Sequence, residues 1–202
     1  MHGESGNGNS KRDKILAAAY AVFSRKGFHG ATIDEIIALA DTGKGTVYNY
    51  FANKEKLFYT LITERSRPFQ EAVTEVVNSE KDPMDKIKEV IKLFLQFYDE
   101  NGDLWRVMMH EMRGLSDDVS SNLTEAQRDK YQLWFKDTIV LLEKVLQEGI
   151  DKQVFRVCDV TKAAYGLFSV IVVMVFHNLV KEGIEQTAEQ ITDIFLYGIA
   201  TK

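Results

Sequence analysis

Residues 32–54 read TIDEIIALADTGKGTVYNYFANK, and this stretch predicts two short helices joined by a tight turn. Thr32 can cap the first helix, because Glu35 stands at the capping-box position three residues later. The apolar residues that follow recur at helical spacing: Ile33, Ile36, Ile37 and Ala40. Residues 41–43 (DTG) then interrupt the helical pattern. A residue in the left-handed conformation and a glycine that starts the next helix are expected here. Two helices joined by about three or four residues form a helix-turn-helix, whose second helix enters the DNA major groove.

The second helix, from Lys44 to about Phe51, divides into an apolar and a polar side. Val47 and Phe51, four residues apart, form its strongly apolar strip and are expected to face the interior of the domain. The exposed side carries no acid and offers groups suited to phosphates, base edges and close backbone approach. Its members are Lys44, Gly45, Thr46, Tyr48, Asn49 and Tyr50. A solvated, tyrosine-rich surface helix is the alternative explanation of this pattern.

The run GKGTVYNYF from Gly43 to Phe51, followed by Asn53-Lys54-Glu55 and Leu57, closely resembles the DNA-binding signature of the TetR family of transcriptional repressors. Residues upstream of the run match the family at the same intervals: Ile15, Ala18, Phe23, Gly27, Phe28, Thr32, Ile36 and Ala40. The resemblance covers roughly residues 11–62 and is highly specific.

The resemblance implies a role for each matching residue. Thr32 resembles the family's contact to a backbone phosphate, and Lys54 its phosphate-binding lysine, at a helix N-terminus that also favours an anion. The groove-facing set would be Lys44, Gly45, Thr46, Tyr48 and Asn49, with Tyr50 directed toward a phosphate. The sequence departs from the family at Asp41, where glycine is usual, and at Gly43, where a small hydroxyl residue is usual. We therefore expect a slightly strained turn.

Helical patterns with clear start and stop signals continue to the C-terminus, and no strand pattern or repeat is visible. The chain is therefore predicted to be all-α with about nine helices: an N-terminal three-helix helix-turn-helix DNA-binding domain plus a larger helical ligand-binding and dimerisation domain. The predicted limits are a disordered arm over residues 1–10, the DNA-binding domain over 11–53 and the effector-binding and dimerisation domain over 54–202. In the larger domain we expect helix breaks at Pro68 and Gly102 and helix starts after the capping boxes at Thr124 and Thr187.

Residues 163–176 (AAYGLFSVIVVMVF) are apolar on all sides of a helix, which predicts burial all round. The run is shorter than the roughly 18–20 residues that a membrane span needs, so no membrane association is expected. In the TetR family the last two long helices pair with their mates in a four-helix bundle. The resemblance thus implies a homodimer through helices at about 160–181 and 187–201. An intramolecular core helix is the alternative.

Methionine and aromatic side chains in the middle of the chain could line a cavity, because they adapt to irregular apolar ligands. With nearby polar groups, the candidate ligand-binding residues are Phe94, Tyr98, Trp105, Met108, Met109, Met112, His110, Tyr165 and His177. The expected effector is small and mostly apolar, with one or two polar groups. Ordinary core packing explains the same stripe equally well.

Composition excludes several classes of protein. The single cysteine, Cys158, excludes an internal disulfide framework and suits the cytoplasm. His110-Glu111 lacks the second histidine of a zinc-protease motif, and residues 43–46 follow no strand that would make them a phosphate-binding loop. The sequence therefore predicts no catalytic centre, metal or cofactor. The net charge of −5 is unevenly placed, because residues 1–60 hold eight Lys and Arg against six Asp and Glu.

The sequence thus predicts a ligand-responsive transcriptional repressor that binds a near-palindromic double-stranded DNA operator as a homodimer and is released by its effector. The competing hypothesis is a helical adaptor that binds protein without binding DNA. Such an adaptor would show no DNA binding that weakens steeply with salt.

Overall fold

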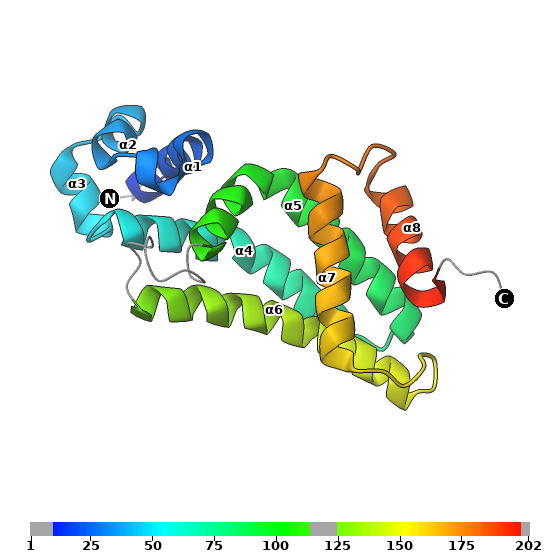
Figure 1. Ribbon diagram of the computed structural model, residues 1–202. Helices are drawn as coiled ribbons and strands as arrows, with labels where there is room; N and C mark the ends of the chain where they lie inside the picture. Colours follow the sequence, from blue (N-terminus) through cyan, green and yellow to red (C-terminus); the bar gives the residue numbers. More distant parts are fainter. Residues whose placement is uncertain (1–9, 114–124, 199–202) are drawn as a thin grey trace, which may run out of the picture.

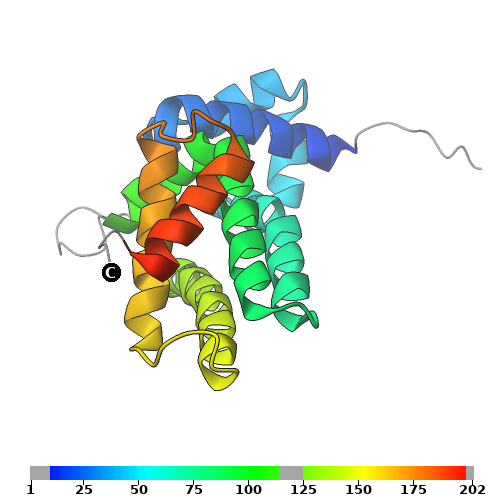
Figure 2. The ribbon, with the colours of Figure 1, turned by 90° about the vertical axis from the view of Figure 1, so that its right-hand side faces the viewer.

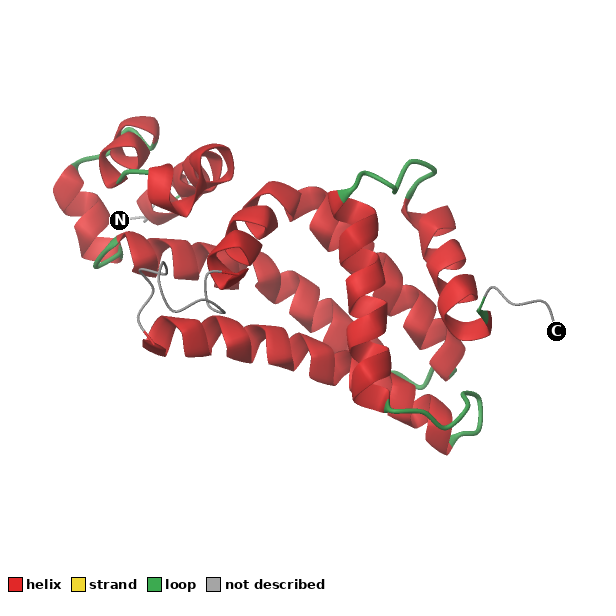
Figure 3. Cartoon of the chain, viewed as in Figure 1, coloured by secondary structure: helices red, strands yellow, loops and turns green. Residues whose placement is uncertain are grey.

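The computed structural model describes residues 10–113 and 125–198, without the side chains of residues 109–134. This part of the chain forms eight helices. Figure 3 shows helices joined by loops and no strand in the described residues. The predicted all-α class is confirmed, and the count is eight helices where about nine were expected. Within the same ranges, no helix has the combined length and apolar character required to cross a bilayer.

The first three helices form a small unit: α1 (Lys11–Gly30), α2 (Ile33–Leu39) and α3 (Lys44–Tyr50). Ser10 caps α1 and Thr32 caps α2, each through a complete capping box. The aromatic core of this unit is closed by a residue of the next helix, because the ring of Phe58 lies 5.0 Å from that of Phe23 and 5.1 Å from that of Phe28. The unit therefore shares its core with the body.

Five longer helices form the body: α4 (Lys54–Asn78), α5 (Pro83–Arg113), α6 (Glu125–Asp151), α7 (Val160–Phe176) and α8 (Ile184–Tyr197). α4 leaves the N-terminal unit and runs along the body (Figure 1). α5 is the central helix, since it packs against α1, α4, α6, α7 and α8. Figure 2 shows α1 lying across α4 and α5, which run side by side beneath it.

Two predicted helix breaks are wrong, because α4 continues through Pro68 and α5 through Gly102. Pro68 removes one helical hydrogen bond, and a glycine in a helix costs about 0.5–1 kcal/mol relative to alanine. Large side chains beyond each break are buried and offset these costs: Phe69 and Val73 after the proline, and Leu104 and Trp105 after the glycine. Tertiary packing thus overrides the local signal for termination.

The ends of the last two helices also differ from expectation. α8 begins after Gly183, at φ +91°, and not at the predicted capping box of Thr187, whose side chain is buried. α8 ends at Tyr197 and α7 ends at Phe176, short of the predicted residues 201 and 181. In the single chain α7 is buried on one side only, so the predicted burial all round would need a partner subunit and stays a prediction. The capping box at Thr124 and residues 1–9 of the predicted arm lie outside the described residues, and the predicted boundary at 53/54 stays a prediction.

A buried lysine ties three helices together at the end of the body remote from α3. The side chain of Lys86 is 3% exposed, and its Nζ donates to Glu148 Oε2 at 2.7 Å and to the Val77 carbonyl at 3.0 Å. Lys152 Nζ donates to the other oxygen of Glu148 at 2.7 Å. Hydrogen bonds from Lys152 and Lys86 lower the pKa of Glu148, so this carboxylate stays ionised opposite the buried ammonium. The far end of α4 is thereby anchored to α5 and α6.

Asp41 provides a test of strain in the turn between α2 and α3. It has φ +48°, which confirms the predicted left-handed residue. We expect Asp41→Gly to raise the free energy of unfolding by about 0.5–1 kcal/mol in urea denaturation, because glycine adopts this conformation without a Cβ clash. Asp41→Ala, the control, should give no such gain. Destabilisation by glycine would instead mean that the Asp41 carboxylate makes a stabilising contact.

Candidate nucleic-acid interface and ligand site

The helix-turn-helix is built by local hydrogen bonds. Thr32 Oγ1 accepts the Glu35 backbone N–H at 3.3 Å, while the Glu35 carboxylate accepts the Thr32 N–H at 3.2 Å. The Thr42 N–H donates to the Ile37 carbonyl at 3.3 Å across the turn. Gly43, with an extended backbone, is the N-cap of α3. Both predicted helices and the turn between them are confirmed.

α3 has the two sides that the sequence predicts. Val47 and Phe51 are buried against α1 and α2. The outer side is exposed, with Tyr48 and Tyr50 at 44% and 48%. Thr46 is half-buried, and the remaining members of the set are exposed: Lys44, Gly45 and Asn49. One short helix therefore presents two phenols, an amide, a cation and a glycine to solvent, and their contact with DNA stays a prediction.

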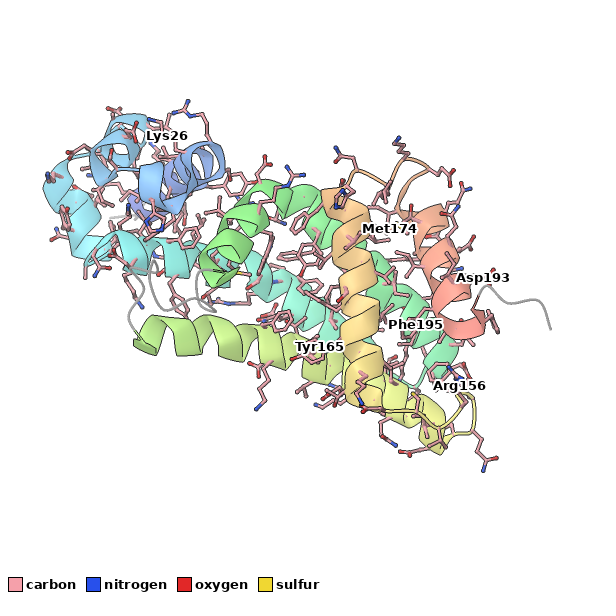
Figure 4. All side chains as sticks on the ribbon, viewed as in Figure 1. Lys26, Arg156, Tyr165, Met174, Asp193 and Phe195 are labelled. Atoms are coloured by element: carbon pink, nitrogen blue, oxygen red, sulfur yellow. The ribbon has the colours of Figure 1, made fainter. Side chains whose placement is uncertain are left out.

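Acidic side chains of α2 lie beside this surface. Lys44 Nζ is 3.2 Å from Asp34 Oδ1, in a pair whose side chains are mostly exposed, so it contributes at most about 1 kcal/mol. Lys26 of α1 pairs with Glu35, and this hydrogen bond is the largest cause of the lowered pKa of Glu35 (Figure 4 labels Lys26). The sequence analysis did not anticipate these acidic neighbours. The position of Asp34, two residues after the N-cap of α2, was the signal for them.

Lys54 lies where it was expected, at the N-terminus of α4, but its ammonium is engaged within the chain. Nζ donates to the carbonyls of Phe28 at 2.9 Å and Ala31 at 3.0 Å and lies 4.6 Å from the centroid of the Phe28 ring. The N-terminus of α4 is capped by Asn53, whose Oδ1 accepts the Lys56 N–H at 2.7 Å. Lys54 therefore fastens the end of α1 to the start of α4, a contact that the sequence pattern did not indicate.

Arg12 and Tyr20 attach α1 to a later part of α4, at Glu64 and Arg65. Arg12 Nη1 donates to Glu64 Oε2 at 3.1 Å, and the guanidinium carbon lies 5.7 Å from the centroid of the Phe51 ring. The bond to Glu64 is the largest cause of the raised pKa of Arg12. Arg65, next along α4, stands over the ring of Tyr20 with its guanidinium carbon 4.5 Å from the centroid. These pairs join residues 39 to 52 positions apart, so no local pattern could reveal them.

The predicted effector-binding residues separate into three groups. Phe94, Tyr98, Trp105 and Met108 are buried together in the body. Tyr165 and His177 are exposed on α7 and at its C-cap, and the ring of Tyr165 lies 5.8 Å from that of Phe135, at the edge of the buried group. The side chains of three further candidates lie outside the described ones: Met109, His110 and Met112.

The buried group forms an aromatic cluster between α5 and α7. The ring of Tyr98 lies 5.7 Å from that of Trp105 and 6.3 Å from that of Phe168. Burial raises the pKa of Tyr98, and its hydroxyl has no hydrogen-bond partner among the described residues. Such a hydroxyl costs about 1–3 kcal/mol when left without a partner, so it is a polar group that a ligand could satisfy. The cluster combines an apolar wall with the Tyr98 hydroxyl.

The outer faces of α7 and α8 carry large exposed apolar side chains. Val173 on α7 is 51% exposed and Ile194 on α8 is 49% exposed, and Tyr165 and Tyr197 are exposed as well. Figure 4 labels Tyr165 on α7 and Phe195 on α8. Large apolar side chains exposed on neighbouring helices are typical of interaction sites when they form one surface. Over the described residues, no group of three or more His, Cys, Asp and Glu side chains could hold a metal ion.

Comparison with known proteins identifies the class to which this fold and surface belong. Residues 15–60 match the family model of the bacterial regulatory proteins of the tetR family, and residues 80–199 match the tetracyclin repressor-like C-terminal domain. The chain belongs to the TetR family of transcriptional regulators.

Individual relatives agree with this membership. The chain is 28% identical over 147 residues to the HTH-type transcriptional repressor NicS of Pseudomonas putida, covering 72% of this chain and 66% of NicS. It is 28% identical over 159 residues to the fatty acid metabolism regulator protein of Bacillus subtilis, covering 78% of each. The crystal structure of the transcriptional regulator FadR from B. subtilis in complex with stearoyl-CoA superposes with a TM-score of 0.77 at 26% identity, over 93% of this chain and 98% of that one. These relatives are regulators of transcription rather than enzymes or adaptors.

The geometry around Lys54 predicts a loss of stability on truncation. Lys54→Ala should lower the free energy of unfolding by about 1–3 kcal/mol, because two charge-assisted hydrogen bonds to carbonyls are lost. Lys56→Ala, two residues on and exposed, is the matched control and should change it by less than about 0.5 kcal/mol. Equal effects of the two substitutions in urea denaturation would show that the Lys54 contacts are not stabilising.

Proposed function

We propose that this chain is a ligand-responsive transcriptional repressor that binds a near-palindromic operator as a homodimer and is released by a small, mostly apolar effector. The observation that carries the proposal is the exposed, acid-free side of α3, presented by a capped helix-turn-helix. Family membership supports DNA binding, and the names of relatives such as NicS support repression.

The DNA contacts follow from the chemistry of each exposed group. Lys44, Gly45, Thr46, Tyr48 and Asn49 would face the major groove. Thr32 and Tyr50 would contact phosphates, as would the one ammonium hydrogen of Lys54 that neither carbonyl accepts. The pair of Lys44 with Asp34 is weak enough to be exchanged for a phosphate or a base edge.

The homodimer would form through α7 and α8. Their exposed apolar side chains would be buried against the same surface of a second copy, as in a two-fold interface. A dimer of this kind places two α3 helices in successive major grooves, about 34–36 Å apart. The uncovered side of α7 supports this arrangement, since an apolar helix is stable only when its faces are buried.

The effector would bind among the aromatic side chains between α5 and α7. Tyr98 supplies the polar contact, and Phe94, Trp105 and Met108 supply apolar wall. Because the similar FadR of B. subtilis has been crystallised with stearoyl-CoA, an acyl chain is the apolar group that we propose. A ligand that prefers one arrangement of the body shifts DNA affinity by typically ~1–3 kcal/mol, or about 5–150-fold.

Selection from a random duplex library tests the proposal. The expected product is an inverted repeat whose half-sites lie about one helical turn apart. Tyr48→Ala should weaken binding to this sequence with little change in melting temperature, since the ring is exposed. Asn49→Ala should relax the base preference at one position of each half-site, at a cost of about 1–3 kcal/mol in discrimination. If no sequence is enriched, or if both variants bind as the unaltered protein does, the proposed surface is wrong.

The dimer can be tested separately by placing a charge on α7. Val173→Glu should convert the dimer to monomer in sedimentation velocity and weaken operator binding at least about tenfold, because the interface would bury an unpaired carboxylate. Val157→Glu is the control, since Val157 is exposed outside α7 and α8. A Val173→Glu protein that remains dimeric would refute the assignment of the interface.

A further inference from the structure

The first turn of α2 carries two carboxylates that differ in what they bind. Glu35 is engaged within the three-helix unit, because it accepts the Thr32 N–H and pairs with Lys26. The Asp34 carboxylate has one ion-pair partner in the described part of the chain, Lys44, whose Nζ lies 3.2 Å from Oδ1. Since Lys44 is the first residue of α3, this pair spans the turn of the helix-turn-helix.

The pair of Asp34 and Lys44 lies at a surface that is proposed to meet a polyanion. The Asp34 side chain is 77% exposed and that of Lys44 is 63% exposed. Among the described residues, Asp34 is the one acid that forms an ion pair with a side chain of α3. So exposed a pair adds little to the stability of the fold, whereas a carboxylate beside DNA repels phosphates. The pair therefore matters chiefly for how α3 binds DNA.

The hydrogen-bonding capacity of the Lys44 ammonium decides which DNA groups it can reach while the pair is kept. The ammonium has three N–H groups, of which Asp34 accepts one. The other two can reach neutral acceptors on base edges, such as guanine O6 and N7. A phosphate would instead bring a second anion close to Asp34, and exchange of Asp34 for a phosphate would leave its carboxylate unpaired beside the DNA backbone. The pair thus favours base edges over phosphates.

We infer that Asp34 is a positioning residue for sequence recognition, which holds Lys44 toward the base edges of the major groove and suppresses its contact with phosphates. The DNA that Asp34 disfavours is duplex without the operator sequence, because such DNA is bound through its phosphates. The inference rests on the proposed function, since it requires α3 to enter the major groove.

The test compares the affinity of the full chain for the selected operator with its affinity for random duplex of the same length, over a range of salt concentrations. Asp34→Asn should raise the affinity for random duplex about fivefold near 0.15 M salt and steepen the slope of log affinity against log salt by about 0.9, because one more phosphate is neutralised. The affinity for the operator should change less than about twofold. The ratio of the two affinities should therefore fall at least about twofold, and an unchanged ratio would overturn the inference.

Asp41→Asn is the matched control for the loss of one negative charge from the helix-turn-helix. Asp41 lies in the turn between α2 and α3, and asparagine tolerates its left-handed conformation. Lys44 pairs with Asp34 and not with Asp41 in the described structure. The control should therefore change both affinities by the same factor and leave their ratio unaltered. An equal fall of the ratio in both variants would mean that the loss of any negative charge is the cause, against the inference.

A second background separates positioning from a structural role. An aspartate in the first turn also stabilises the N-terminus of a helix, so Asp34→Asn is checked for its melting temperature. In a Lys44→Gln background, Asp34→Asn should leave the ratio of affinities unchanged, because Asp34 acts through the ammonium that is now absent. A fall of the ratio that is equally large with and without Lys44 would contradict the positioning role.

The outcomes distinguish this inference from the proposed function. If the unaltered protein selects no DNA sequence, the proposed function is wrong, and the role of Asp34 in sequence recognition is wrong with it. If the unaltered protein selects an operator and Asp34→Asn leaves the ratio of affinities unchanged, the role of Asp34 alone is wrong.

Discussion

The structure depends on one shared core, in which Phe58 of α4 packs against Phe23 and Phe28 of α1. Three short helices bury too little apolar surface to be stable alone, so the helix-turn-helix requires α4 to complete its interior. The position of α3 relative to the body is consequently set by α4. Anything that moves α4 moves the surface of Lys44, Tyr48 and Asn49 with it.

Polar, partly buried contacts also attach α1 to the body, in addition to this core. Three sets of contacts join α1 to α4 around this core: Arg12 with Glu64, Tyr20 with Arg65, and Lys54 with two carbonyls. A partly exposed pair such as Arg12 with Glu64 contributes about 1 kcal/mol or less, while the charged hydrogen bonds of Lys54 contribute more. At the other end, buried Lys86 fixes α4 to α5 and α6. α4 is thus held at both ends, by the shared aromatic core at its start and by the Lys86 contacts at its far end.

Sequence patterns predicted the elements whose causes are local, and they failed where burial competes with a local signal. The capping box of Thr32, the buried strip of Val47 and Phe51 and the left-handed Asp41 were all recognised, because each depends on neighbours within four residues. The breaks expected at Pro68 and Gly102 were wrong, since the side chains beyond them are buried strongly enough to extend the helix. The grouping of Phe94, Tyr98, Trp105 and Met108 was anticipated, but the exposure of Tyr165 was not, because a uniformly apolar helix gives no sign of which side packs.

The sequence by itself determined that this chain is all helical, that it opens with a helix-turn-helix and that α3 has a polar, acid-free side. These properties follow from helical spacing, capping and residue type, which act over one or two turns. Only the tertiary structure decided which partners Lys54 and Arg12 have and which face of α7 is uncovered. The physical reason is that these features join residues far apart in the chain, and their contacts depend on how whole helices pack.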